Sequence, residues 1–530
     1  MNNLSENFND NPLSQYEYKT DLKLEKNFTL TEKETKIFSI IKKIIEKNNL
    51  KTICRVAGGW VRDKLLNKHS IDIDIALDNM KGCDFAKLIN DEIYPGKDKV
   101  GIINQNIEKG KHLETATIPI CDIWIDFVNL RSDNDNIFGN PKEDSERRDL
   151  SINSLFYNIN LGEIEDFTNG FNDLKNGIIK TPIDPYLTFQ DDPLRIMRMI
   201  RFAVKYQFRI HDEINECIFK YNDEYRNAFI NIISNERVQK ELCYILKLKY
   251  SNAGIYLIYK YNLIDAILKL ESYGNKDLNN NIKKEVVKMV NIFLIGYYVA
   301  QNNNFCENNE YNEDESFRLT THLLLLTVSF RKFEVKVGKE LYSISKLILK
   351  ETLKLPNDEL KENFIMTTSI DDFMKIVNEG NYKRLSSGRI LRNIQYKNIP
   401  KLFISSIALE YIEKNNFNDI IKEVDKNLLG EIINKYKNFN DYIKKENLLH
   451  IDELKPLLDG KEIIKELKIN PGKQIGILLE SLLDKQIETP TFTKENAIDF
   501  LNKKREEIKN IFPIENTKQK KKKNKWKDKN

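Results

Sequence analysis

The sequence has few of the features that mark secreted, zinc-binding or membrane proteins. Only six of its 530 residues are cysteine, and no two of them form a Cys-x-x-Cys pair. We therefore expect reduced intracellular thiols, with neither a zinc site nor a disulfide framework. No apolar run approaches the about 20 residues that cross a bilayer, so no membrane partner is expected.

The first ten residues also lack the features of a targeting segment. They contain no basic stretch and no apolar run, and they include Glu6 and Asp10. Mitochondrial presequences are rich in arginine and poor in acidic residues. We expect an intracellular protein of the cytoplasm, the nucleus or both, because this N-terminus does not support mitochondrial import.

The chain has little excess charge outside its C-terminus. Its net charge is +4, and residues 518–530 hold eight lysines and one aspartate. Taking that +7 away leaves −3 for the rest, so any nucleic-acid surface must be a local patch. The lysine-rich end has three interpretations: a nuclear-import address, an additional phosphate-binding arm, or a disordered extension. Its Trp526 could stack on a base.

The most informative segment is 53–78, which predicts a strand, a glycine turn, a helix and a second strand. Asp72 and Asp74 alternate with isoleucines in the second strand, so both carboxylates face one side while Ile73 and Ile75 enter a core. Two carboxylates in this arrangement suit Mg²⁺, which takes oxygen ligands and is often shared with substrate phosphates. The alternative is an Asp-x-Asp on an ordinary solvated strand.

The turn before the predicted helix suits a phosphate. Gly58 and Gly59 allow close approach of the backbone, and amides at a helix start attract anions. Arg62 follows one helical turn later and can add a forked cation. A metal pair beside a phosphate-binding turn indicates phosphoryl or nucleotidyl transfer. A Gly-Gly turn by itself would be a weak signal.

Two further strands are predicted at 113–119 and 122–130. In the second, Trp124, Asp126 and Val128 share one face. An aspartate in so apolar a run needs a partner or a function. If this strand lies beside the first carboxylate pair, Asp126 is a third carboxylate at the metal site. The alternative is a hydrogen-bonded aspartate at a strand edge.

Residues 146–155 predict a helix whose Arg148, Asp149 and Asn153 form a polar cluster. From about residue 188 onward the pattern is helical. There Arg195, Arg198 and Arg201 form one stripe, which is either a solvated face, a set of internal ion pairs or an edge that reads bases and phosphates.

Four other segments are predicted to be irregular. We expect loops at 95–111 and 131–145, and surface loops in the Asn- and acid-rich stretches 275–282 and 301–316.

Taken together and in this order, the motifs resemble those of the class II tRNA nucleotidyltransferases, the CCA-adding enzymes, in their eukaryotic form. The resemblance is dense over 51–250 and thinner over 451–485. It is carried by Gly58-Gly59-Trp60-Val61-Arg62-Asp63, Asp72-Ile73-Asp74, Glu146-Arg147-Arg148-Asp149, Asp191-Asp192-Pro193-Leu194-Arg195, Ser234-Asn235-Glu236-Arg237-Val238 and Leu454-Lys455-Pro456. The base-reading motif often begins with Glu in this family, whereas Asp191 stands here.

The resemblance implies a role for each matching residue. Asp72 and Asp74 hold Mg²⁺ and activate the primer hydroxyl, with Asp126 as the candidate third carboxylate. Glu236 and Arg237 brace the neck helices. The implied nucleotide-binding residues are Gly58 and Gly59 with Arg62 for the triphosphate, Arg148, Asp149 and Asn153 for the ribose, Asp192 and Arg195 for the base edge, and Arg198 and Arg201 in support.

The resemblance also implies an α+β fold. A nucleotidyltransferase head, built from a mixed β-sheet with helices, precedes an all-helical neck, body and tail. The expected parts are a disordered tail (1–30), the catalytic head (31–180), a neck with the base-reading motif (181–250), a body with Asn-rich insertions (251–450), a tRNA-binding tail (451–515) and a Lys-rich disordered extension (516–530).

The implied activity is addition of C, C and A to the 3′ end of tRNA from CTP and ATP, without a nucleic-acid template. A poly(A) polymerase or a partial enzyme adding only CC or only A is the first alternative. A catalytically idle RNA-binding protein is the second. The implied partners are tRNA, CTP and ATP, the implied cofactor is Mg²⁺, and no oligomeric state is predicted.

Overall fold

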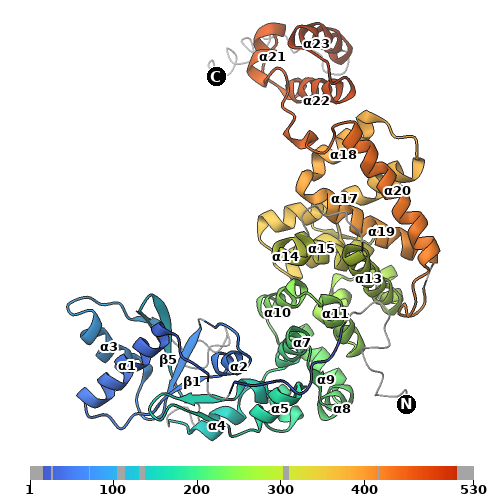
Figure 1. Ribbon diagram of the computed structural model, residues 1–530. Helices are drawn as coiled ribbons and strands as arrows, with labels where there is room; N and C mark the ends of the chain where they lie inside the picture. Colours follow the sequence, from blue (N-terminus) through green and yellow to red (C-terminus); the bar gives the residue numbers. More distant parts are fainter. Residues whose placement is uncertain are drawn as a thin grey trace, which may run out of the picture. The chain divides into compact units, whose positions relative to one another are not determined.

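The computed structural model describes residues 16–25, 28–70, 72–103, 114–130, 138–302, 310–415 and 417–509 (Figure 1). It forms two compact units. The first holds the described residues up to Val290 together with 333–354 and 420–423, and the second holds the others. The six-part division stays a prediction, and the Lys-rich extension lies outside the described residues.

A seven-stranded sheet forms the centre of the N-terminal part, in the order β3-β4-β5-β2-β1-β6-β7. β2 and β5 pair in parallel, whereas the other neighbouring strands of this sheet pair antiparallel. The strands are β1 (Cys54–Ala57), β2 (Ile73–Leu77), β3 (Gly101–Ile103), β4 (Thr115–Ile120), β5 (Ile123–Asn129), β6 (Phe156–Asn158) and β7 (Glu163–Glu165).

The predicted strand, turn, helix and strand of 53–78 are confirmed as β1, α2 (Gly59–Leu65) and β2. Two helices, α1 (Glu32–Lys47) and α3 (Gly82–Ile93), lie along the sheet in Figure 1. The ring of Phe85 on α3 packs against that of Phe127 on β5, 5.3 Å between centroids. The sheet face that α3 covers is therefore the apolar one. Asp74 and Asp126 lie on the opposite face, which α3 does not cover.

The register of β4 and β5 is fixed by their connection. Cys121 and Asp122 both have positive φ, which is the conformation of a two-residue hairpin turn of type I′. Asp126 consequently pairs with Thr117, and Trp124 pairs with Pro119. A one-residue slip would turn Asp126 into the core, so this turn also sets which face the carboxylate occupies.

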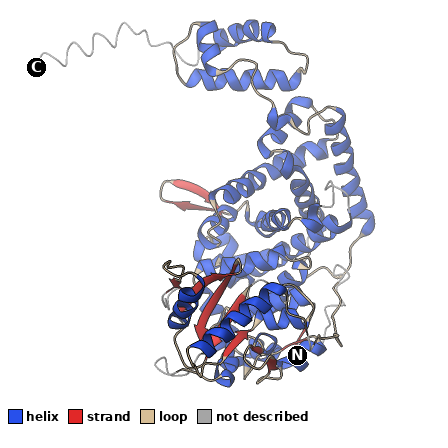
Figure 2. Cartoon of the chain, turned by 60° about the vertical axis from the view of Figure 1, so that its left-hand side comes forward, coloured by secondary structure: helices blue, strands red, loops and turns tan. Residues whose placement is uncertain are grey.

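The rest of the first unit is mostly helical. Its further helices are α4 (Pro141–Glu146), α5 (Gly170–Asn176), α6 (Pro185–Asp191), α7 (Arg195–Tyr206), α8 (Asp212–Lys220), α9 (Asn222–Asn231), α10 (Asn235–Lys247), α11 (Ser251–Lys260), α12 (Ile264–Ile267) and α16 (Ile344–Leu347). Two small sheets were not predicted: β8 (Ile178–Ile179) with β9 (Arg209–Ile210), and the hairpin of β10 (Glu334–Val337) and β11 (Glu340–Ser343), which stands apart from the main sheet in Figure 2.

The second unit contains only helices and turns among its described residues. A long helix, α13 (Lys276–Asn302), crosses from the first unit into the second. The others are α14 (Glu310–Glu313), α15 (Glu315–Thr327), α17 (Asn357–Glu379), α18 (Arg384–Ile394), α19 (Ile399–Asn415), α20 (Lys426–Lys445), α21 (Gly460–Leu467), α22 (Lys473–Glu488) and α23 (Lys494–Lys509). None of the described helices is both long enough and apolar enough to cross a bilayer.

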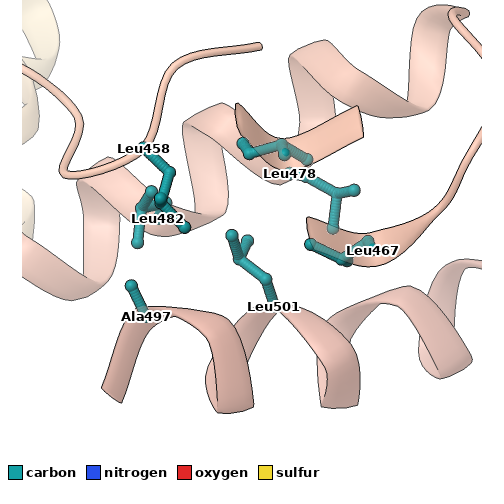
Figure 3. Close-up of a cluster of buried hydrophobic side chains, with 7 residues drawn as sticks. Leu458, Leu467, Leu478, Leu482, Ala497 and Leu501 are labelled. Carbon is teal, nitrogen blue, oxygen red and sulfur yellow. The ribbon is translucent and has the colours of Figure 1, made fainter. Parts of the chain in front are cut away.

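The last three helices enclose a small core of their own (Figure 3). Leu467, Leu478 and Leu501 come from α21, α22 and α23 and are each at most 2% exposed. Asp459 caps α21 with a reciprocal capping box.

Three local predictions are wrong. No helix spans 146–155, because α4 ends at Glu146 and Leu150 is extended. The stretch 275–282 is not a loop, since the Asn275 side chain accepts a hydrogen bond from the Leu278 N–H and caps α13. The predicted loop at 131–145 contains α4, although 131–137 lies outside the described residues.

The predictions for two other stretches are wrong in part. The stretch 301–316 includes α14 and the start of α15, and 303–309 is not described. Likewise 95–111 includes β3, and 104–113 is not described.

The predicted disorder of 1–30 is wrong for residues 16–25. Tyr16 is buried, and its hydroxyl donates to the Ala203 carbonyl at 2.8 Å. The backbone N–H of Lys19 donates to the Gln207 carbonyl at 2.8 Å, and that of Leu22 to Lys175 at 2.7 Å. Burying the large aromatic ring of Tyr16 favours an ordered segment even though the residues around it are mostly polar. Residues 1–15 lie outside the described part.

Candidate active site

Three aspartates occupy neighbouring positions where β2 and β5 lie side by side. Asp74 pairs directly with Asp126 across the parallel strands, and Asp72 comes just before β2. Ile73 and Ile75 are buried on the opposite face. The strand that carries Asp126 therefore lies beside the segment that carries Asp72 and Asp74, as the prediction of a third carboxylate required.

Negative charge at this point is only weakly compensated. Asp74 reaches solvent, yet the surrounding protein displaces enough water that desolvation raises the pKa of its carboxyl. The neighbouring carboxylate of Asp126, and then that of Asp72, raise this pKa further, whereas Arg148 lowers it. A bound cation would relieve this repulsion.

The donor set fits a hard divalent cation. Its members are all carboxylate oxygens, the type that Mg²⁺ accepts. Among the described residues, no three acidic, histidine or cysteine side chains converge closely enough to hold a metal on their own. Such a cation is usually bound by one or two carboxylates together with substrate phosphates, so two of these aspartates are sufficient to hold it.

The glycine turn lies on the other side of β2, because β1 is its other neighbour. Gly58 has φ +69°, which favours glycine, and a Cβ there would stand 2.8 Å from Nη1 of Arg148 and 3.1 Å from the Asn153 carbonyl oxygen. The backbone N–H of Gly58 donates to the Leu155 carbonyl at 2.9 Å. The turn is thus held tightly against the segment that carries Arg148 and Asn153.

Substituting Gly58 with alanine is expected to lower kcat/KM for the nucleotides that the resemblance implies about a hundredfold, because the added methyl group displaces the Arg148 guanidinium and shifts the turn. Steady-state kinetics measures this. Gly96→Ala is the matched control, since Gly96 also has positive φ but no atom lies within 4 Å of the position that its methyl group would take. Equal losses in the two variants would contradict the prediction.

Arg62 is buried rather than free. Its guanidinium donates to the Asn153 side-chain oxygen and lies 2.9 Å from Asp63. It also lies over the rings of Phe202 and Tyr206, 5.0 and 4.9 Å from their centroids. The structure therefore brings Arg62 and Asn153 together, as parts of one hydrogen-bonded group.

The predicted cluster of Arg148, Asp149 and Asn153 forms, although the predicted helix does not. Asp149 accepts from Nδ2 of Asn153 at 3.0 Å, and Arg148 binds Asp144 at 2.7 Å. The other oxygen of Asp149 accepts from Nε of Arg198 at 2.8 Å. Burial raises the pKa of Asp149, but the charge of Arg198 and the hydrogen bonds lower it more, to about 2.

The three arginines of the stripe form internal ion pairs, which was one of the three alternatives, and their reading of bases and phosphates stays a prediction. Arg195 pairs with Asp191 at 2.6 Å, and Arg201 pairs with Glu241 at 2.7 Å. Arg198 lies 3.6 Å from Glu241 and also pairs with Asp149. Their side chains are 12%, 36% and 15% exposed in chain order, so they do not form a solvated face.

Asp192 and Arg195 are not paired with each other. Asp192 accepts from Arg237 of α10 at 2.7 Å, while Arg195 donates to the backbone carbonyls of Thr188 and Arg147. The second oxygen of Asp192 accepts from the Leu194 N–H at 3.2 Å, so each of the two side chains is held by its own partners.

The sequence did not single out Glu241, which is 5% exposed and binds two of the arginines. The sequence feature that could have identified Glu241 is its position four residues after Arg237, between the buried Val238 and Leu242.

Comparison with known proteins gives a consistent result. Residues 54–180 match the family described as Poly A polymerase head domain, and residues 207–271 match the Probable RNA and SrmB- binding site of polymerase A. The CCA tRNA nucleotidyltransferase, mitochondrial, of Candida glabrata is 31% identical over 533 residues, covering 91% of this chain and 96% of that protein. The Saccharomyces cerevisiae protein of the same name is 30% identical, covering 89% and 93%.

This chain belongs to the CCA tRNA nucleotidyltransferase family.

The CCA-adding enzyme solved in complex with CTP has the same fold, with a TM-score of 0.60 at 21% identity over 90% of this chain and 96% of that one. The resemblance and the α+β fold class drawn from the sequence are confirmed. As a member of this family the chain is a nucleotidyltransferase, an enzyme class that depends on a divalent metal ion. Neither the poly(A) polymerase nor the idle binding protein is favoured.

The localisation predicted from the N-terminus is wrong. Two CCA tRNA nucleotidyltransferases that match along most of the chain carry the word mitochondrial in their names. The charge of the first ten residues was therefore a poor guide, because presequences are defined by a helical distribution of charge over a longer stretch.

Proposed function

We propose that this chain adds C, C and A in turn to the 3′ end of tRNA, using CTP and ATP and releasing pyrophosphate. The observation that carries the proposal is the pairing of Asp74 with Asp126, one strand away from the Gly58–Gly59 turn. Nucleotidyl transfer requires this combination: carboxylates for a metal ion beside backbone amides that receive phosphates.

Asp72 and Asp74 hold Mg²⁺ in this proposal, with Asp126 beside them. When bound, the metal neutralises charge on the triphosphate and lowers the pKa of the primer hydroxyl. The raised pKa of Asp74 supports the assignment, because an uncompensated carboxylate gains most from a cation.

The triphosphate lies against the backbone of Gly58 and Gly59, and the buried Arg62 adds a fixed positive charge. The Gly58 N–H is held by the Leu155 carbonyl, so the amides at the start of α2, from Gly59 onward, are the ones that face the phosphates. Arg148, Asp149 and Asn153 face the ribose, whose 2′-hydroxyl both donates and accepts hydrogen bonds. Their mutual contacts support this role, since a preorganised polar group discriminates better than a free one.

The base is read by Asp192 and Arg195, with Arg198 and Arg201 in support. A carboxylate accepts and a guanidinium donates, so the two match the mixed pattern of a Watson–Crick edge. Arg237 holds Asp192, and Asp191 holds Arg195, so each reader is fixed by its own partner.

A primer-extension assay tests the function. The purified chain and Mg²⁺ receive a tRNA that lacks its last three nucleotides, with each NTP separately and with all four together. We expect extension by C, C and A that then stops. Asp72→Ala should abolish it, because one metal ligand is lost.

Each other result contradicts the proposal in a distinct way. Unlimited addition of A indicates a poly(A) polymerase. Extension that stops after CC, or that requires a primer ending in CC, indicates a partial enzyme. Tight tRNA binding without incorporation indicates an RNA-binding protein.

A further inference from the structure

An exposed indole lies in the same row as the carboxylates. Trp124 of β5 is 63% exposed and shares a face with Asp126, two residues further along the strand. β2 and β5 pair Asp74 with Asp126, and continuing this parallel register by one step of two residues sets Trp124 beside Asp72. Neighbouring strands are about 4.8 Å apart, so the indole adjoins the catalytic row.

A single exposed apolar side chain needs no explanation by itself. Trp124 differs because of its position, next to the carboxylates and on the face that α3 leaves open. Its ring stacks on no other aromatic ring within the described residues. Of the chain's three tryptophans, Trp60 is 1% exposed and Trp526 lies outside the described part, so Trp124 is the one described indole with an available face.

The sheet order assigns the two sides of the carboxylates. β2 has β1 on one side and β5 on the other. The Gly58–Gly59 turn follows β1, and continuing the β1–β2 register sets Ala57 opposite Asp74. The triphosphate therefore approaches from the β1 side, and Trp124 lies on the β5 side.

The geometry of nucleotidyl transfer indicates which of the two substrates approaches from the β5 side. In nucleotidyl transfer the attacking oxygen and the leaving pyrophosphate are roughly in line, on opposite sides of the α-phosphorus. With the triphosphate on the β1 side, the attacking hydroxyl of the RNA comes from the β5 side. The end of a single-stranded RNA carries unpaired bases, and aromatic side chains bind such bases by stacking, whatever their identity.

We propose that Trp124 is a primer-binding residue, on whose indole the 3′-terminal base of the tRNA stacks. The proposal rests on the proposed function and assigns to that site the side of primer entry. Stacking tolerates every base, which suits a primer end that changes from the discriminator base to C and then to C again as nucleotides are added.

Kinetics separates the primer from the incoming nucleotide. Trp124→Ala should raise KM for tRNA about tenfold and leave KM for CTP and ATP unchanged, and Trp124→Phe should restore most of the loss because it keeps a stacking ring. The matched control is Leu161→Ala, which removes an apolar side chain 69% exposed in the turn between β6 and β7. An unchanged KM for tRNA, or a rise in KM for the nucleotides instead, overturns the proposal.

Fluorescence tests the contact without turnover. A Trp526→Phe chain is titrated with tRNA lacking its terminal A, in the absence of NTP, and the emission of Trp526→Phe/Trp124→Phe is subtracted. Quenching of the Trp124 signal at saturating tRNA is expected, and unchanged emission overturns the proposal. This arm does not require catalysis, so a chain that fails to add CCA would still report whether Trp124 meets RNA.

Discussion

Asp74→Asn is expected to lower kcat by roughly three orders of magnitude or more while raising the thermal stability of the metal-free protein. The loss of activity follows from removing a metal ligand, since each 1.4 kcal/mol of lost transition-state stabilisation is about a tenfold loss in rate. Single-nucleotide incorporation into tRNA measures kcat, and thermal unfolding in the presence of a chelator measures stability.

The gain in stability follows from the sign of the pKa shift. The pKa of Asp74 is raised in the folded protein, so the folded state binds a proton here more readily than the unfolded state does. Above the unfolded pKa, near 4, the charged carboxylate therefore destabilises the fold. Asparagine removes that charge, so the variant should exceed the wild type at neutral pH, and the difference should disappear in acid.

Asp122→Asn is the matched control, because Asp122 has 96% of its side chain exposed and φ of 63°, a conformation that asparagine tolerates. It should retain activity and stability. An Asp74→Asn enzyme with a tenth of the wild-type rate, or with lower thermal stability, would show that Asp74 is not a metal ligand in a repulsive site.

Asp149→Asn is expected to destabilise the N-terminal part by about 2 kcal/mol and to raise KM for both nucleotides. The variant leaves the Arg198 guanidinium with only the more distant Glu241, at 3.6 Å, as a charged partner, and the one-third exposure of that guanidinium limits the cost. Urea unfolding followed by the emission of the buried Trp60 measures the effect.

The difference in unfolding free energy between the wild type and Asp149→Asn is expected to depend on pH. The pKa of Asp149 is lowered to about 2, so its stabilising contribution is fully present above its unfolded pKa near 4. The contribution is lost as pH falls from about 4 to 2. The difference between wild type and variant should therefore be constant from pH 8 to 5.

A double-mutant cycle with Arg198→Ala identifies the partner. If Asp149 acts through Arg198, the double variant should be little less stable than either single variant. Additive losses would show that the two side chains stabilise the fold independently.

The helix starts show what local sequence can predict. Thr31 forms a capping box with Glu34, and Ser234 caps α10 through its hydroxyl, and both caps are made by residues within three positions of each other. Amino-acid composition predicted secondary structure less reliably than such capping residues did. The Asn-rich start of α13 is helical because Leu278 and Ile282 are buried at helical spacing.

Local sequence patterns were enough to predict the carboxylates and the glycine turn of the candidate site. Alternation in β2 placed Asp72 and Asp74 on one face, and only glycine fits the conformation at Gly58. These are properties of neighbouring residues, set by backbone geometry within a few positions.

The pairing of charged residues could not be predicted in the same way, because the partners are far apart in the sequence. Asp149 and Arg198 are 49 positions apart and Asp192 and Arg237 are 45 apart, so no local rule relates them. Asp126 stands beside Asp74 because β5 happens to be the parallel neighbour of β2. Such partners depend on how strands and helices pack, and packing is set by the burial of the whole apolar core rather than by any one motif.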